Sequence, residues 1–235
     1  MAPSPAKLCV YCGSPADTVD HVPPKAIVPE PARNSIITVP ACRACNNRFS
    51  KDDGYLMLLA MADESGASKD SAHVAGKVIR WTQKPNKKGQ LTSLMKGLRS
   101  HTILTRAGRR LPTFTFQLDT ERLLPSCRRI ITALHYDLRR ERMPPGFVAL
   151  AVPPDDPQTN EIRDQLRLLF AYNNPLPPMF HKIGNDAFQY RFRGFPEAKG
   201  HYVWHLVFFG HLHVFGLIAE QDQTHTSLPV PVQAT

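Results

Sequence analysis

The sequence lacks any long apolar run of the kind that crosses a membrane or opens a secretory signal. Its first residues, MAPSPAKL, contain no apolar stretch of about 7 or more residues, which a signal peptide needs. The most apolar segment, VWHLVFFGHLHVFGLI at 203–218, is interrupted by three histidines and two glycines. We therefore expect a soluble globular protein of the reducing cytoplasm with no membrane partner.

Cysteine is also scarce, and four of the five cysteines form two Cys-x-x-Cys pairs. Cys9 and Cys12 form the first pair, and Cys42 and Cys45 form the second. In a reducing compartment such pairs indicate a metal site rather than disulfides. Two residues between thiolates let both bind one tetrahedral ion, so we predict a structural zinc with no open coordination position. Cys127 is expected to be a small buried hydrophobe.

Acidic residues are few in the middle of the chain. Residues 77–142 hold sixteen Lys and Arg against four Asp and Glu, which gives this segment +12 in a chain of net charge +9. Clustered cations attract a polyanion because their contacts with phosphates release condensed counterions. The alternative is a basic surface that serves solubility alone.

The residues between the cysteine pairs have a pattern of their own. TVDHV at 18–22 and SIITV at 35–39 read as strands that end at prolines, and a helix follows from Arg43. Neighbouring residues of a strand point to opposite faces. Asp20 and His21 therefore cannot serve one ion in the same way, and we expect one to be a ligand and the other a base.

Residues 9–53 resemble the HNH endonucleases of the ββα-metal type, in the zinc-stabilised branch with CxxC, DH and CxxCN. The resemblance implies an α+β protein with an N-terminal ββα-metal, treble-clef-like module. It implies that His21 is the general base, that Asp20 and Asn46 hold a catalytic Mg²⁺ or Mn²⁺, and that Asn34 braces the loop. The pattern here is His, Asn, Asn rather than His, Asn, His; an oxygen ligand suits Mg²⁺, and the third ligand stays open.

The stretches DHVPPK and VPACRACNNRFSKDDGYL also resemble a group of uncharacterised bacterial HNH proteins of similar length. That resemblance covers most of the chain and implies no particular substrate. The chemistry implied is hydrolysis of a phosphodiester, most readily of DNA, with RNA left open. His21 suits proton abstraction because an ordinary histidine pKa lies near ~6.5. The alternative function is a zinc-braced nucleic-acid-binding module that does not cut.

Several charged residues near the motif have two interpretations each. Lys25 and Arg48 could contact the scissile or a flanking phosphate, or could be ordinary solvated cations. Asp52 and Asp53 could add a metal ligand, although a cap or a salt bridge to the basic region is the commoner role of such acids.

The pattern predicts three parts: the nuclease module at 1–54, a basic α+β accessory region at 55–221, and a disordered tail at 222–235. Within the accessory region, helices are predicted at 55–63, 72–83 and 91–104, and a hairpin that pairs 101–105 with 113–118 overlaps the last of them. A helix with Asp119 as its N-cap should have one apolar face (Leu123, Cys127, Ile130, Ile131, Leu134 and Leu138). Its other face carries arginines that we expect to track phosphates, namely Arg122, Arg128, Arg129, Arg139, Arg140 and Arg142.

The last third reads as mixed, with strands at 147–152, 187–193, 201–209 and 213–220 and a helix at 161–172. A second metal site is one interpretation of four histidines in this region, namely His201, His205, His211 and His213. Without acids or cysteines nearby, packing within an aromatic sheet is the stronger interpretation. The sequence leaves open whether two copies act as a homodimer.

Overall fold

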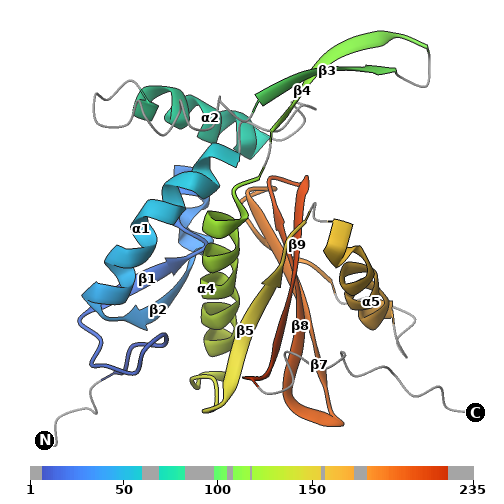
Figure 1. Cartoon of the computed structure of the whole chain (residues 1–235). Coiled ribbons are helices and arrows are strands. Elements are labelled where there is room, and N and C mark those ends of the chain that lie inside the picture. The colour runs from blue at the N-terminus through green and yellow to red at the C-terminus, as the bar shows by residue number, and fades with distance from the viewer. Residues whose placement is uncertain are drawn as a thin grey trace, which may run out of the picture.

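The structure is a computed structural model that describes residues 7–59, 69–82, 98–104, 108–116, 118–154, 157–171 and 179–221. It is a mixed α+β protein, as the sequence predicts. Figure 1 shows a small N-terminal unit, a long central helix, a large sheet and a projecting two-stranded ribbon.

The N-terminal unit is a strand–loop–strand–helix arrangement. β1 (Thr18–Val22) pairs antiparallel with β2 (Ile37–Ala41), and α1 (Arg43–Leu58) follows directly. The connection between the strands contains the short 3-10 helices η1 (Lys25–Ile27) and η2 (Glu30–Ser35). β1 ends where prolines begin, because proline has no N–H to donate to the strand ladder. The two predicted strands and the helix from Arg43 are confirmed, but the expected end of the second strand at Pro40 is wrong, because β2 continues through Pro40 to Ala41.

The long helix α4 (Thr120–Arg139) lies between this unit and the large sheet (Figure 1). Asp119 caps it, because its carboxylate accepts the Arg122 N–H at 3.3 Å. The predicted apolar face is buried except at Leu138, which is 41% exposed. Sheet and helix come so close at Gly216 that a Cβ there would clash with the Ile131 side chain of α4.

The large sheet has five antiparallel strands in the order β5-β9-β8-β7-β6. Their bounds are β5 Phe147–Val152, β6 His181–Ile183, β7 Phe188–Phe195, β8 Ala198–Phe208 and β9 Leu212–Glu220. One face packs on α4 through side chains such as Trp204, and the other packs on α5 (Asn160–Ala171) through side chains such as Phe215. Both faces are covered, which is why β8 and β9 are almost continuously apolar.

Two further elements lie at the end of the molecule where α1 ends. α2 (Lys69–Thr82) is tied to the turn before β7, because the buried Asp70 carboxylate accepts the N–H groups of Asn185, Asp186 and Ala187 at 2.8–3.1 Å. β3 (Leu98–Leu104) and β4 (Arg110–Phe116) form a separate antiparallel sheet. In Figure 1 this ribbon extends away from the rest of the molecule.

Several sequence predictions need correction. The predicted helix at 55–63 is not separate, because α1 runs through Gly54 to Leu58. The boundary expected after residue 54 thus falls inside a helix, and buried residues from both sides of it, such as Val39 and Tyr55, share one cluster. Burial of Tyr55 and its successors outweighs the cost of about 1 kcal/mol for glycine in a helix.

The predicted helix at 91–104 is wrong over 98–104, where residues pair with β4 instead. Its first part and the tail at 222–235 lie outside the described residues. The short strand β6 was not predicted. None of the helices in the described ranges combines the length and hydropathy that a membrane crossing requires.

Candidate metal centre and the polar site beside it

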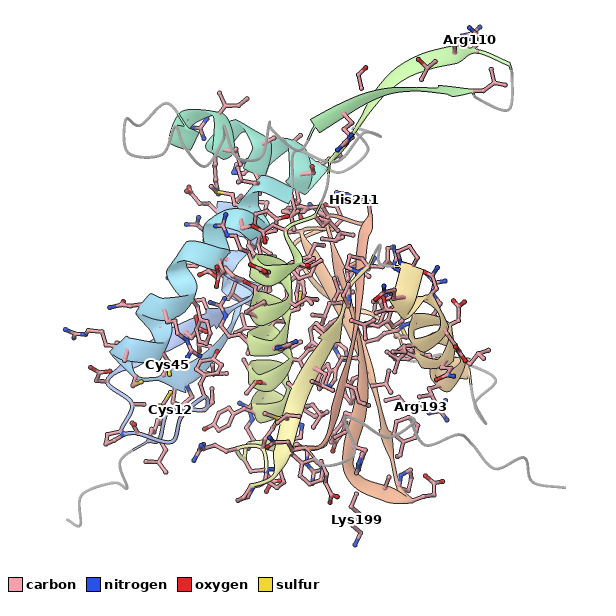
Figure 2. All side chains as sticks on the ribbon, in the orientation of Figure 1. Cys12, Cys45, Arg110, Arg193, Lys199 and His211 are labelled. Atoms are coloured by element: carbon pink, nitrogen blue, oxygen red, sulfur yellow. The ribbon has the colours of Figure 1, made fainter. Side chains whose placement is uncertain are left out.

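The four paired cysteines converge at one end of the N-terminal unit. Their sulfur atoms all lie within 4.8 Å of one another, and the Sγ atoms of Cys12 and Cys42 are 3.6 Å apart. Sulfurs around a tetrahedral zinc, each about 2.3 Å from the ion, would stand about 3.8 Å apart, whereas disulfide sulfurs are about 2.0 Å apart. The geometry therefore fits four ligands of one metal ion. Figure 2 labels two of them, Cys12 and Cys45, beside the start of α1.

Local backbone structure explains how each pair is presented. The Gly13 N–H donates to the Cys9 carbonyl at 2.9 Å. Gly13 has φ +81°, a backbone conformation that residues with a side chain rarely adopt. Cys42 is the N-cap of α1, and its Sγ accepts the Cys45 N–H at 3.5 Å. A tight turn and a helix start thus point two thiolates each at a common centre.

The surroundings of the cluster shift the pKa values of two of its thiols in opposite directions. Hydrogen bonds from Ser14, with smaller contributions from Cys42 and Cys9, lower the pKa of the exposed Cys12 thiol to about 6. Burial raises the pKa of Cys45, and the neighbouring cysteines add to this. A divalent cation would favour the thiolate form at all four positions. Among the described residues, no other three His, Cys, Asp or Glu side chains come close enough to share a metal ion.

Beside this cluster, β1 divides its side chains between two faces. Asp20 and Val22 are buried, whereas Val19 is 52% exposed and His21 is half-buried. Asp20 and His21 therefore point to opposite faces, as strand alternation predicts.

Both carboxylate oxygens of Asp20 already have partners. Oδ2 accepts the Tyr11 hydroxyl at 2.5 Å and lies 3.6 Å from Arg129 Nε, and Oδ1 accepts the His21 N–H at 2.8 Å. Burial and the Asp20 charge both raise the pKa of Tyr11. Asp20 thus anchors the interior of the unit in this structure.

Arg129 is the centre of a buried ion-pair network that joins α4 to the N-terminal unit. Its side chain is 1% exposed, and its Nη2 lies 2.8 Å from Asp53 Oδ1. Its guanidinium also lies 4.9 Å from the centre of the Phe49 ring. Burial acts to lower the pKa of Arg129, but Asp53, Asp20 and Tyr11 outweigh it and raise that pKa.

The prediction that Arg129 belongs to an exposed phosphate-tracking face is therefore wrong. Position 129 borders the apolar sector of α4, and two carboxylates on α1 and β1 offset the cost of burying a cation there. The commoner role expected for Asp52 and Asp53 is confirmed, because Asp52 lies 3.9 Å from Arg122 and Asp53 pairs with Arg129.

Asn46 of α1 is hydrogen-bonded to β1, the strand that carries His21. Asn46, in the first turn of α1, donates from Nδ2 to the Val19 carbonyl at 3.1 Å and to the Thr18 hydroxyl at 3.3 Å. Val19 and His21 are two residues apart, about 7 Å along a strand. Partial burial lowers the pKa of His21, Lys25 lowers it further, and Asp20 opposes both. The imidazole is thereby held mainly neutral near pH 7.

The remaining predicted residues are spread over the surface. Asn34 in η2 is exposed, as are Lys25 at the start of η1 and Arg48 on α1, whose guanidinium lies 4.9 Å from the Phe49 ring centre. Arg122 is partly buried beside Asp52 and stacks over Tyr55. Arg140 is exposed at the end of α4 and pairs with Asp137 at 2.9 Å. The structure does not bring these residues into one group with His21.

The histidines of the large sheet pack among aromatic side chains. His205 Nε2 lies 2.9 Å from His213 Nδ1, and Arg191 Nε donates to His205 Nδ1 at 3.1 Å. The His205 ring stacks on Phe215 at 4.3 Å. This arrangement matches the predicted aromatic packing.

Sequence reasoning missed the role of Tyr11 and Arg129. Tyr11 lies inside the first cysteine pair, so its side chain is positioned by the same turn as the thiolates. Asp53 and Arg129 are far apart in sequence, and no local pattern indicates their pairing.

Comparisons with protein-family models, with curated proteins and with solved structures find no match to this chain. What the site can do is therefore argued from its own chemistry. It offers four convergent cysteine sulfurs, a half-buried imidazole with a lowered pKa on β1, and the Asn46 amide hydrogen-bonded to that strand.

Proposed function

We propose that this protein is a zinc-stabilised HNH-type endonuclease that hydrolyses phosphodiester bonds of DNA, with His21 as general base. The observation that carries the proposal is the joint placement of His21 and Asn46. Both lie on one small strand–loop–strand–helix scaffold, and Asn46 is hydrogen-bonded to the strand that carries His21. Action in the cytoplasm, and action as a homodimer to cut both strands, belong to the same proposal.

The proposed chemistry needs a base that is neutral at the working pH. The lowered pKa of His21 meets this condition, and the half-exposed ring leaves it accessible to a water molecule. His21 takes a proton from the water molecule while the oxygen of that water attacks phosphorus. The bond between phosphorus and the 3′ oxygen breaks, and the 3′ oxygen leaves and takes up a proton from solvent. The main chain of His21 is held by pairing with β2 and by the contact to the Asp20 carboxylate.

Zinc is the metal we propose for the four cysteines. Thiolates from two turns match its preference for sulfur ligands and tetrahedral geometry. With four sulfurs its coordination is complete, so the ion stabilises the scaffold and takes no part in hydrolysis.

The residues present do not form a ready site for the proposed catalytic Mg²⁺ or Mn²⁺. Asp20 has both oxygens engaged, and the positive charge of Arg129 lies where a cation would have to bind. Ligation by Asp20 and Asn46 stays a prediction, and it requires Asp20 to exchange Arg129 for the ion.

The same ion pair favours the alternative function, a zinc-braced module that binds nucleic acid without cutting it. A module of that kind needs the cysteines and the Asp20–Arg129 pair for its fold, but it has no use for a neutral histidine beside Asn46. We prefer the nuclease for this reason.

A nicking assay separates the two functions. Supercoiled plasmid is incubated with the full-length protein and Mg²⁺ or Mn²⁺, beside the variants His21→Ala and His211→Ala. His211 is an exposed histidine in the turn between β8 and β9 of the large sheet and serves as the matched control (Figure 2). We expect His21→Ala to nick at least about 100-fold more slowly, with zinc content unchanged, and His211→Ala to be as active as the parent.

Equal nicking by the parent and by His21→Ala would remove the assignment of the base. Absence of nicking in the parent, with DNA binding retained, would establish the binding module instead.

A further inference from the structure

The segment that contains the β3–β4 ribbon is free of acidic residues. Residues 71–118 hold ten Lys and Arg and no Asp or Glu. The ribbon (Leu98–Leu104 paired with Arg110–Phe116) lies at the end of this segment, and Arg99 and Arg110 are both exposed. The ribbon therefore has no negative charge of its own to oppose a polyanion.

The ribbon presents both faces of β3 to solvent. In the register of the pair, Arg99 lies on one face, while Thr102 and Leu104 lie on the other with Arg110 opposite Leu104. Arg99, Thr102 and Arg110 are exposed, and Leu104 is 70% exposed. An isolated pair of strands is marginally stable by itself, and the exposed side chains described here are free to contact a partner.

The ribbon's dimensions fit the major groove of B-form DNA. Seven paired residues span about 23 Å at ~3.3 Å per residue, and the groove, about 12 Å wide and 8.5 Å deep, admits a two-stranded ribbon. Figure 2 shows Arg110 at the far end of the ribbon, away from the body of the molecule. Arginine at that end can reach phosphates or the guanine edge in the groove.

We infer that the β3–β4 ribbon docks in the major groove of duplex DNA. This inference names the substrate class of the proposed nuclease and in that sense rests on the proposed function, although binding can be measured without cleavage. Duplex RNA is disfavoured as the partner, because the major groove of an A-form helix is too narrow and deep for side chains to read. A single strand offers no groove at all.

The test measures binding by the full-length His21→Ala protein with no divalent ion added. The probes are a fluorescein-labelled 24-base-pair DNA duplex, an RNA duplex of the same sequence, and the single DNA strand. The double variant Arg99→Ala/Arg110→Ala is compared with Arg167→Ala/Lys199→Ala, which removes two exposed cations from α5 and from the start of β8.

We expect the ribbon variant to bind duplex DNA at least about tenfold more weakly, and the slope of log affinity against log salt to fall by about 2. The control variant should keep parental affinity, and duplex DNA should bind more tightly than the other two probes. Zinc content and thermal unfolding should be the same in all proteins, because neither pair of residues lies in the core.

Equal affinities of the ribbon and control variants would overturn the inference, as would RNA or single-stranded DNA binding as tightly as the duplex. These outcomes differ from failure of the nuclease proposal. A parent that nicks plasmid while the ribbon variant binds normally contradicts the ribbon alone. Ribbon-dependent binding by a parent that never nicks contradicts the nuclease alone.

Discussion

The N-terminal unit and the five-stranded sheet share an apolar cluster and differ in what they add to it. The unit packs a small cluster of Cys9, Ala41, Cys45 and Phe49 beside a buried network of charges. The sheet buries large side chains on both faces, with Trp204 among those that are fully inaccessible. The unit thus adds four convergent cysteines and buried charges to its apolar packing, whereas the sheet relies mainly on apolar area.

The difference concerns where chemistry can be placed. Apolar packing tolerates many arrangements of side chains, whereas the hydrogen bonds and ion pair of Asp20 have specific partners and hold a short strand in one position. The candidate base lies on the strand that this network holds. The described side chains of the β3–β4 ribbon are exposed, which suits a surface for a partner.

The largest effect should come from the cysteines. Cys42→Ser removes one of four ligands, and structural zinc contributes about 10–16 kcal/mol of apparent binding energy to small modules. We expect loss of bound zinc, measured by elemental analysis, and loss of amide-exchange protection in β1 and β2 while β8 stays protected.

Cys127→Ser is the matched control, because Cys127 is buried in α4 away from the four cysteines, and it should retain zinc. Equal loss of protection in β1 and β8 after Cys42→Ser would show that the two regions unfold as one. Retained zinc in a folded Cys42→Ser protein would contradict the four-cysteine site.

The next largest effect should come from Arg129. Arg129→Met leaves Asp20 and Asp53 without their cation inside the molecule, and breaking a buried pair in this way costs about 3–5 kcal/mol. The free energy of unfolding from urea titration measures this loss. Arg128→Met, one residue earlier and exposed, should change it by less than about 0.5 kcal/mol. Similar values for the two variants would mean that the charge network contributes nothing specific.

The smallest expected effect is a pH-dependent loss of stability that arises from the buried His205 of the large sheet. Burial lowers the pKa of His205 to about 3, with Arg191, His213 and Arg167 adding to the shift. Below the unfolded value of ~6.5, the unfolded chain binds a proton that the folded chain cannot, so stability falls as pH drops from ~6.5 toward 3. From pH 7 to pH 5 we expect a loss of about 2 kcal/mol.

The variant His205→Gln should lack this contribution, and the exposed His73→Gln on α2 should keep it. Urea titrations at pH 7 and pH 5 measure both. Parallel pH profiles for the parent and His205→Gln would place the lost stability elsewhere.

Local patterns in the sequence predicted much of the fold. Short-range periodicity and turn residues predict β1, β2, the start of α1, the cap at Asp119 and the strands of the large sheet other than β6. The end of α1 did not follow, because burial of Tyr55 decides whether the helix continues past Gly54. The segment 98–104 was ambiguous for a similar reason, since only pairing with β4 fixes it as a strand.

The convergence of the four cysteines could be predicted from the sequence, but the buried contacts around Asp20 could not. Cysteine spacing predicted the convergence of four sulfurs, and strand alternation predicted the opposite directions of Asp20 and His21. The pairing of Asp20 with Arg129 spans more than a hundred residues, and no local pattern indicates it. Tertiary packing alone determines which arginine of α4 is withdrawn from the surface.

The position of α4 between the two regions limits how the N-terminal unit can be transplanted. A graft of residues 1–54 onto another protein would carry Asp20 and Asp53 but leave behind the arginine that neutralises them. Arg142, whose guanidinium lies against Gly13 at the cysteine turn, would be left behind as well. A recipient would have to supply its own helix with a cation at the matching place, so this unit is inherited most readily together with its partner helix.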